Sequence, residues 1–207
     1  MNKPVRILGI AGSRRRESYN RAALRAATKL VPEGVTLDVF ELDGIPGLNQ
    51  DDKQNLPEKV LDLKRRVRQA DGILFVTPEY NYSVPGVLKN AIDWASRPCE
   101  SVSNGKPVAI MGASIGAIST ARAEYHLRQM MVFLNMFPVN QPEGMIGNAA
   151  DRFRCKRQSY GRHNNRLHPK ATPGACGVDC ANSEACAWIK CDERCPHWAA
   201  ELIHGTS

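Results

Sequence analysis

Residues 5–30, VRILGIAGSRRRESYNRAALRAATKL, predict a strand, a tight turn and a helix in immediate succession. The apolar run of residues 5–11 stops at Gly12, and a turn rich in hydroxyl groups and arginines follows. From about residue 18 to residue 30, alanines and leucines recur at helical spacing. This order directs free backbone N–H groups and the positive end of a helix dipole at one point.

The turn is typical of a phosphate site. A solvated loop in which Ser18 is only the helix N-cap is the structural alternative. The nucleotide-hydrolysing pattern G-x-x-x-x-G-K-[ST] is absent, and Gly9 and Gly12 lack the spacing of the dinucleotide pattern G-x-G-x-x-G. A single terminal phosphate, as on a mononucleotide, therefore fits best. Four side chains add donors around it: Ser13, Arg15, Ser18 and Asn20.

Strands and helices alternate with short connections over residues 1–150. Further strands are expected at 36–40, 72–76, 108–113 and around 138–146, and further helices up to about residue 70, at 84–94 and near 117–135. The run GILFV at 72–76 is typical of a parallel strand buried on both faces. The pattern predicts a three-layer α/β fold with a doubly wound, five-stranded parallel sheet. Ligands of such sheets bind beyond the carboxyl ends of the strands.

Two further loops are expected at that edge. Residues 77–86, TPEYNYSVPG, offer an aromatic face, backbone amides and a carboxamide, and two prolines stiffen them. A flat heteroaromatic ring would suit this loop. Residues 112–117, GASIGA, are small enough for close backbone approach. The plainer alternative is that Tyr80 and Tyr82 are ordinary turn aromatics and that Gly116 begins a helix.

Composition narrows the class of protein. A chain of 207 residues with 43% hydrophobic and 24% charged residues is enough for one globular domain with a substantial core. The net charge of +7 is spread along the chain, with too few interleaved aromatics for a nucleic-acid partner. No apolar run approaches the roughly 20 residues that span a membrane, and the N-terminus reads as a first strand. We therefore expect a cytoplasmic protein with no membrane partner.

The last quarter of the chain departs from this pattern. A zinc module is one interpretation, but the paired C-x-x-C spacing of common zinc sites is absent, so no metal site is predicted. A disulfide framework conflicts with a cytosolic core. The cysteines concerned are Cys155, Cys176, Cys180, Cys186, Cys191 and Cys195.

The favoured hypothesis is that residues 154–207 are read in a shifted frame. Back-translated with permitted codons and re-read one nucleotide later, the segment from residue 154 yields a string ending in FIRKLLQALVAWIA. That string is an amphipathic helix, which is the closing helix that a doubly wound sheet requires. The prediction is a domain over residues 1–153, followed by an atypical, poorly ordered Cys/His-rich tail over 154–207.

Three motifs carry a resemblance to a known family. GSRRRESYN resembles the G-S-x-R-x-x-S-x-N phosphate loop of the NADPH-dependent FMN reductase family, which includes soluble quinone, chromate and azo-dye reductases. TPEYNYSVPGVLKNAIDW resembles its isoalloxazine loop, and GASIGAISTARAEYHLRQMMVFLNMF its fourth-strand segment. The resemblance spans roughly residues 4–153. It implies a flavodoxin-like fold, FMN as prosthetic group, NADPH or NADH as electron donor, and a homodimer or homotetramer.

The resemblance also implies an activity and roles for residues. The protein would be an FMN-dependent NAD(P)H oxidoreductase that passes hydride by a ping-pong mechanism to quinones, chromate, azo dyes or free flavin, with no catalytic side chain. A flavodoxin-type electron carrier without its own substrate is the alternative, although such carriers are typically acidic. Glu79 is expected to position the ring, either with its side chain or through its backbone alone. Ser13, Arg15, Ser18 and Asn20 would hold the phosphate and ribityl chain, Pro78, Glu79, Tyr80 and Asn81 would frame the ring, and Ser114 would close its far side.

Overall fold

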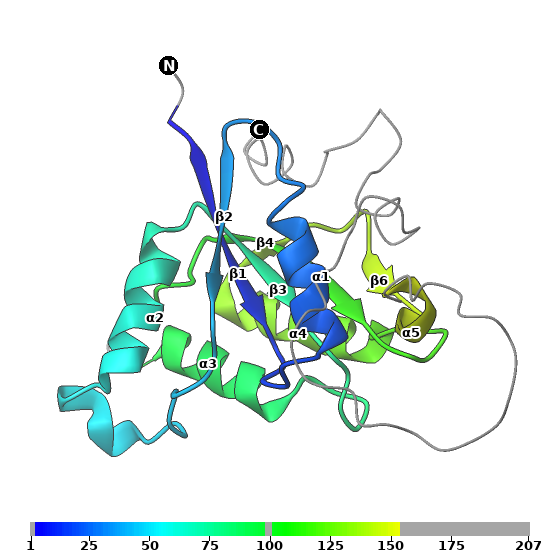
Figure 1. The fold of residues 1–207 in the computed structure, drawn as a ribbon. Coiled ribbons are helices and arrows are strands. Elements are labelled where there is room, and N and C mark those ends of the chain that lie inside the picture. Colours follow the sequence, from blue (N-terminus) through cyan, green and yellow to red (C-terminus); the bar gives the residue numbers. More distant parts are fainter. Residues whose placement is uncertain (1–2, 98–100, 154–207) are drawn as a thin grey trace, which may run out of the picture.

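The structure is a computed structural model that describes residues 3–97 and 101–153 (Figure 1). The hypotheses about residues 154–207, including the shifted reading frame, the lack of order and the zinc module, lie outside the described residues.

A parallel sheet forms the centre of the molecule, with strand order β2-β1-β3-β4-β5. The doubly wound α/β architecture predicted from the sequence is therefore confirmed. Both faces of the strands meet helices, so β3 is buried along its whole length. The strands are β1 (Val5–Ala11), β2 (Val35–Phe40), β3 (Gly72–Val76), β4 (Pro107–Ala113) and β5 (Phe137–Pro138).

The fifth strand position is shared by two short segments. β5 pairs with the beginning of β4, and β6 (Gly144–Ile146) pairs, also in parallel, with its end. The single strand expected around 138–146 is thus interrupted. Pro138 and Pro142 lack the N–H group that a continuous ladder needs, which accounts for the break.

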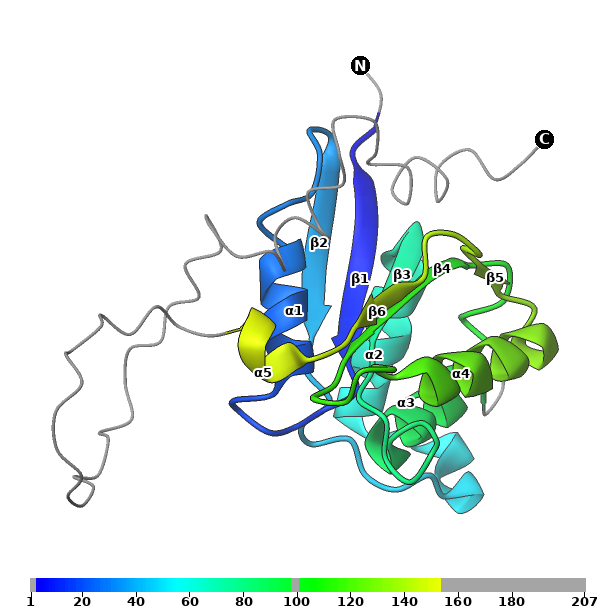
Figure 2. The same cartoon turned by 90° about the vertical axis from the view of Figure 1, so that its right-hand side faces the viewer.

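Helices cover both faces of the sheet, giving the three layers expected (Figure 2). On one face lie α1 (Tyr19–Ala27) and the single turn α5 (Ala149–Arg152). On the other face lie α2 (Glu58–Gln69), α3 (Gly86–Ser96) and α4 (Ala121–Leu134). A 3-10 turn, η1 (Gln50–Gln54), precedes α2.

The core is divided by the sheet into two clusters. The larger one, under α2, α3 and α4, includes the fully buried Trp94, Leu63 and Met131. The smaller one, under α1, is rich in alanine, so that helix lies close to the sheet. At Gly9 a Cβ atom would come within 2.6 Å of Leu24 Cδ1, which explains why glycine occupies the centre of β1.

Candidate functional site

The turn between β1 and α1 presents unpaired donors. Ser18 is the N-cap of α1, and its Oγ accepts hydrogen bonds from the backbone N–H groups of Asn20 (3.2 Å) and Arg21 (3.5 Å). The hydroxyl hydrogen of Ser18 is still available to donate. Within the described part of the chain, the amides of residues 14–17 donate to no acceptor. Free amides at a helix N-terminus fit a phosphate group.

Arginines in this turn and in the first turn of α1 differ in whether a carboxylate pairs with them. Arg14 pairs with Asp43 (2.9 Å), and Arg21 pairs with Glu41 (2.9 Å). Arg15 forms no ion pair with a described residue, and its guanidinium lies 5.9 Å from the centroid of the Tyr19 ring. Arg15 is therefore free to meet an anion, and its contact with a phosphate stays a prediction. Ser13, at the base of the turn, is buried.

Asn20 joins the turn to the far side of the sheet. Its Nδ2 donates to the Ala113 carbonyl (2.9 Å), and its Oδ1 accepts from the Ala113 N–H (2.9 Å). The buried carboxamide thus ties the phosphate turn to the end of β4. These two bonds assign Asn20 a structural task, and contact with the phosphate or ribityl chain stays a prediction.

The loop after β3 is a tight hairpin that exposes aromatic side chains. Tyr80 and Ser83 exchange two backbone hydrogen bonds of 3.0 Å. Between them Asn81 and Tyr82 have φ angles of 50° and 63°, as a two-residue hairpin turn with the right twist requires. Tyr80 and Tyr82 are exposed, whereas Pro78 is buried at the base of the loop.

Glu79 connects this loop to α4. Its Oε2 accepts from the N–H groups of Arg122 (3.0 Å) and Ala123 (3.3 Å), and its Oε1 accepts from Arg122 Nη1 (2.9 Å). The Thr120 side chain makes no capping bond, so Glu79 caps α4 in its place. The Arg122 guanidinium lies 3.9 Å from the centroid of the Tyr82 ring. No pattern in the sequence indicates this cap, because the partners are 43 residues apart.

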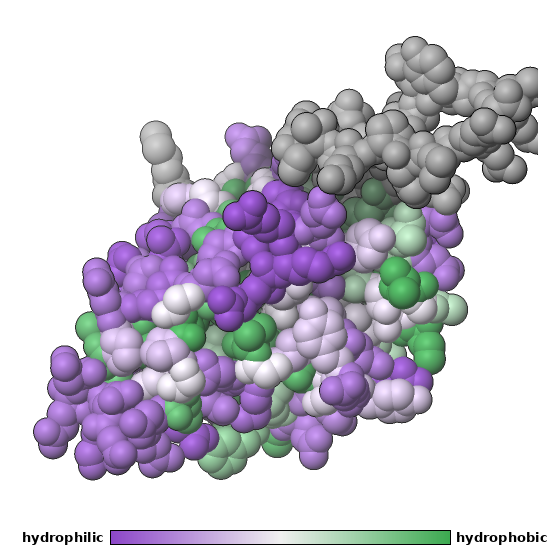
Figure 3. Space-filling model, turned by 60° about the horizontal axis from the view of Figure 1, so that its bottom comes forward, coloured by the Kyte–Doolittle hydropathy of each residue, from purple (hydrophilic) through white to green (hydrophobic). Residues whose placement is uncertain are grey.

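Close contacts bring the three loops together at the carboxyl ends of the strands. A Cβ atom at Gly12 would lie 3.3 Å from Pro78, and one at Gly112 would lie 2.5 Å from the Thr77 carbonyl. Ser114, which is half-buried, donates its N–H to the Ile146 carbonyl (3.0 Å), and its Oγ accepts from Gly116 N–H (3.2 Å). Figure 3 shows this face of the molecule, where hydrophobic side chains gather in patches among hydrophilic ones.

Glu124 lies in the first turn of α4 and is 1% exposed. Its Oε1 accepts from the Thr120 hydroxyl (2.9 Å), while its Oε2 has no partner among the described residues. Burial raises the pKa of Glu124 to about 7, and Glu143 and Glu79 act in the same direction. Within the run STARAEYHL the residue looks like an ordinary helical glutamate, so the sequence gives no sign of its burial.

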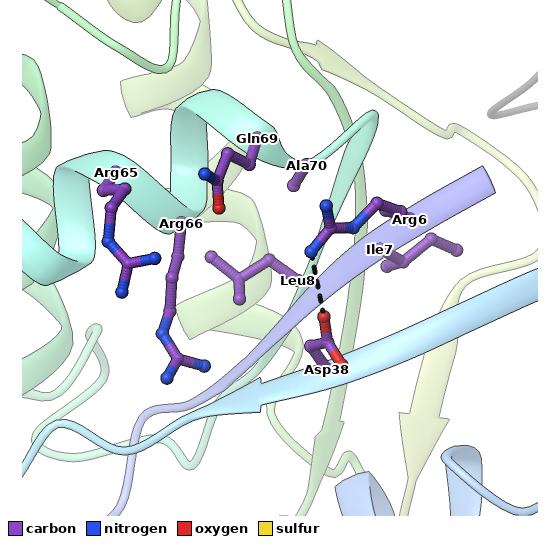
Figure 4. Close-up of a pocket in the computed structure, with 8 residues that line it drawn as sticks. All are labelled: Arg6, Ile7, Leu8, Asp38, Arg65, Arg66, Gln69 and Ala70. Carbon is purple, nitrogen blue, oxygen red and sulfur yellow. Dashed lines mark ion pairs between the residues drawn. The ribbon is translucent and has the colours of Figure 1, made fainter. Parts of the chain in front are cut away.

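A separate cavity of about 240 Å³ lies between β1, β2 and α2 (Figure 4). Arg6 lies 3.7 Å from Asp38 there, and Arg66 lies 3.3 Å from Asp62. Arg65 also pairs with Asp62, so each of the three arginines that line the cavity has a carboxylate partner, with one carboxylate shared. The cavity is lined by the first half of β1, so it lies away from the edge where the three loops meet, and we assign it no part in the site.

Two features are absent from residues 3–97 and 101–153. No group of three or more His, Cys, Asp or Glu side chains in them could hold a metal ion. None of the helices in these ranges has the length and apolar character needed to cross a membrane.

The strand order, the turn of free amides after β1 and the aromatic hairpin after β3 are the features of flavodoxin-like flavoproteins. The model of the NADPH-dependent FMN reductase family matches residues 5–151, and the chain belongs to that family. It is an oxidoreductase family, so the implied cofactors are FMN and NAD(P)H. The free amides at residues 14–17 and the unpaired Arg15 fit the FMN phosphate.

Similar proteins agree with this assignment. The chain is 52% identical over 154 residues to an NAD(P)H-dependent FMN reductase of Pseudomonas aeruginosa, covering 74% of this chain and 83% of that one. It is 46% identical over 143 residues to a 2-hydroxy-1,4-benzoquinone reductase of a Burkholderia species, covering 69% and 78%. The solved structure of FerB, a flavoenzyme NAD(P)H:acceptor oxidoreductase from Paracoccus denitrificans, is 35% identical with a TM-score of 0.65, covering 68% and 78%.

Proposed function

We propose that this protein reduces quinones with electrons from NADPH or NADH, using FMN bound at the carboxyl edge of the sheet. The observation that carries the proposal is the turn after β1, where amides and a guanidinium without partners among the described residues lie at the same sheet edge as the loop with the exposed aromatic hairpin of residues 80–83. The quinone reductase among the relatives supports this substrate class.

When bound, FMN supplies the redox chemistry, since it can take a hydride from NAD(P)H and give two electrons to an acceptor. The protein's own residues bind and orient. Ser13, Arg15 and Ser18 hold the phosphate, and Asn20 fixes the turn that carries them. The loop of Pro78, Glu79, Tyr80 and Asn81 frames the ring, with Ser114 on the far side.

Exposed apolar side chains on two of the loops favour flat, apolar molecules as the electron acceptors. Tyr80 and Tyr82 on one loop and Ile115 and Ile118 on the other are each more than half exposed. Quinones suit such a surface, and azo dyes and free flavin are further aromatic candidates. Chromate has no comparable apolar surface and stays a prediction from the family resemblance alone. The reductase names of the relatives favour an enzyme over an electron carrier.

The test combines a spectrum with kinetics. Purified protein titrated with FMN should bind it, and the visible absorbance should bleach when NADPH or NADH is added without oxygen. Steady-state oxidation of NAD(P)H should then require a quinone such as benzoquinone. FMN binding without NAD(P)H oxidation would support the electron carrier, and a folded protein that ignores FMN would refute both functions.

We further propose that the protein forms a homodimer or homotetramer and works in the cytoplasm, where NAD(P)H is supplied. Support for assembly comes from large apolar side chains on the surface near the end of α4, since Val132, Phe133 and Phe137 are all exposed. Replacing Phe133, which is 85% exposed, by serine should shift the mass measured by light scattering toward the monomer. The same substitution at the exposed Leu61 on α2 is the control.

We also propose that the FMN-binding domain is residues 1–153 and that the natural reading frame is lost after Phe153. The family match ends at residue 151, which supports this boundary. Sequencing the gene from an independent isolate across the Phe153 codon tests the idea. An unbroken frame there would refute it.

A further inference from the structure

Glu124 is a buried carboxyl group that the proposed chemistry does not use. It lies in the first turn of α4, at the carboxyl edge of the sheet, and among residues 3–97 and 101–153 its side chain has one hydrogen-bond partner, which leaves one oxygen unpartnered. An ionised carboxylate normally needs several donors when it is withdrawn from water. The surroundings of Glu124 therefore suit the neutral acid better than the anion.

Glu124 is connected to the loops of the site through its hydrogen-bond partner Thr120. Thr120, which donates to it, packs directly against Gly112 near the end of β4. Ser119, the residue before Thr120, donates its hydroxyl hydrogen to the Gly112 carbonyl (3.1 Å). On the outer side of the same helical turn, Glu79 of the ring loop caps α4 through Arg122 and Ala123. Glu124 thus lies behind the junction of two of the three loops.

The charges that face Glu124 come from three segments. Glu79 lies on the loop after β3, Glu143 on the segment between β5 and β6, and Arg128 one turn further along α4. Two of these groups are acidic and one is basic. Ionisation of Glu124 would add a negative charge beside Glu79, whose carboxylate holds the ring loop against α4.

We propose that Glu124, in its neutral form, is a positioning residue for FMN: through Thr120 it holds the end of β4 and the first turn of α4 where the ring loop can dock. Ionisation weakens FMN binding in two ways. It loosens this junction by placing an unsatisfied charge behind it, and it adds negative potential at the edge that receives an anionic ligand. The inference rests on the proposed cofactor site.

The experiment measures FMN affinity by flavin fluorescence from pH 6 to pH 8.5. The FMN affinity of the natural chain should fall by about fivefold or more across this range. A fivefold change is at the lower end of what coupling between two sites of a protein typically produces. In Glu124→Gln, an isosteric variant that cannot ionise, the fall should be smaller by that factor. Glu58→Gln, at an exposed position in the first turn of α2, is the matched control and should follow the natural chain. Ionisation of the FMN phosphate affects all three alike, so the difference between the curves reports Glu124.

Two further measurements keep the test independent of folding and of activity. By linkage, FMN binding at pH 7.5 should take up more protons in the natural chain than in Glu124→Gln, as calorimetry in two buffers would show. Thr120→Val should weaken FMN binding and Thr120→Ser, which keeps the hydroxyl, should restore it. Identical pH profiles for the natural chain and Glu124→Gln would overturn the inference while leaving the cofactor site intact. Absence of FMN binding in every variant would instead refute the proposed function.

Discussion

Arg15 is the guanidinium in the turn after β1 that we expect to meet the FMN phosphate. A hydrogen bond to a charged group contributes roughly 1.5–3 kcal/mol, so Arg15→Ala should weaken FMN binding by about tenfold to a hundredfold. Fluorescence titration measures this. Arg25→Ala removes the same charge from the exposed last turn of α1 and should change the affinity little. Equal losses in the two variants would show that only the overall charge matters.

Glu124 should also give the stability of the protein a distinct pH dependence. Its pKa is raised from 4.5 to about 7 in the folded protein, so the folded state binds more protons between these values. The free energy of unfolding contributed by this group therefore falls as pH rises from about 4.5 to 7, by about 3 kcal/mol in all. Urea unfolding without FMN should show Glu124→Gln gaining about that much, relative to the natural chain, between pH 5 and pH 8. A constant difference between the two proteins would contradict this expectation.

At the scale of single residues, the sequence predicts roles that depend on neighbouring residues. It does not show which residues far along the chain a side chain will contact. Ser18 as the N-cap follows from its place before a helical pattern, and the structure has it there. The partners of Asn20 and Glu79 lie 93 and 43 residues away, so only the folded chain shows what their side chains do. The same applies to Glu124, whose burial depends on how α4 lies on the sheet.

At the scale of elements, the end of β4 leaves no room for a side chain. A Cβ atom at Gly112 would lie 2.5 Å from the Thr77 carbonyl and would collide with the Thr120 hydroxyl. Gly112→Ala should therefore lower the free energy of unfolding by about 2 kcal/mol or more and should weaken FMN binding. Urea unfolding and fluorescence titration measure the two effects.

Gly86 offers the matched control for this substitution. It is the first residue of α3, and a Cβ atom there would meet nothing within 4 Å. Gly86→Ala should leave stability unchanged or raise it by up to about 1 kcal/mol, because alanine loses less conformational entropy than glycine. If both variants behaved alike, the close packing of Gly112 would not control this edge of the sheet.

The order of the strands and helices could be predicted because alternating apolar runs and turn residues act locally. The ends of the helices depend on more than the local sequence. α1 was expected to reach residue 30 but ends at Ala27, and α4 was expected near 117 but begins at Ala121. In the second case residues 114–120 form a turn in which the Ser119 hydroxyl bonds Gly112 and delays the helix. Such bonds depend on the tertiary fold, which the periodicity of a segment does not contain.

At the scale of the whole molecule, the layer that holds α1 is the thinner one. Around its buried cluster Leu37, Val39 and Met111 remain only partly buried, and α5 is a single turn. A chain whose residues from 154 onward follow the re-read frame would add an amphipathic helix to this protein. Its melting temperature should exceed that of the present chain by about 5 °C or more, equivalent to roughly 2 kcal/mol for a protein of this size.

A chain ending at Phe153 is the control for that comparison. It should melt near the present chain, and all three should bind FMN with similar affinity, because the three loops of the site precede residue 150. A re-read chain no more stable than the control would mean that the shifted frame contributes nothing to the fold.

The carboxamide of Asn20 joins the first turn of α1 to the end of β4, which is not a neighbour of β1 because β3 lies between them. These two hydrogen bonds cross-link the turn after β1 to the sheet, so the backbone that we expect to receive the FMN phosphate has a fixed position. The aromatic hairpin, by contrast, is held at its base and against α4, where Glu79 caps the helix and the Ser83 hydroxyl meets His126 Nδ1 (3.0 Å), while its two tyrosines stay exposed. We therefore expect electron acceptors of varied shape to fit against the exposed tyrosines, while the affinity for FMN, which depends on the fixed turn, stays the same.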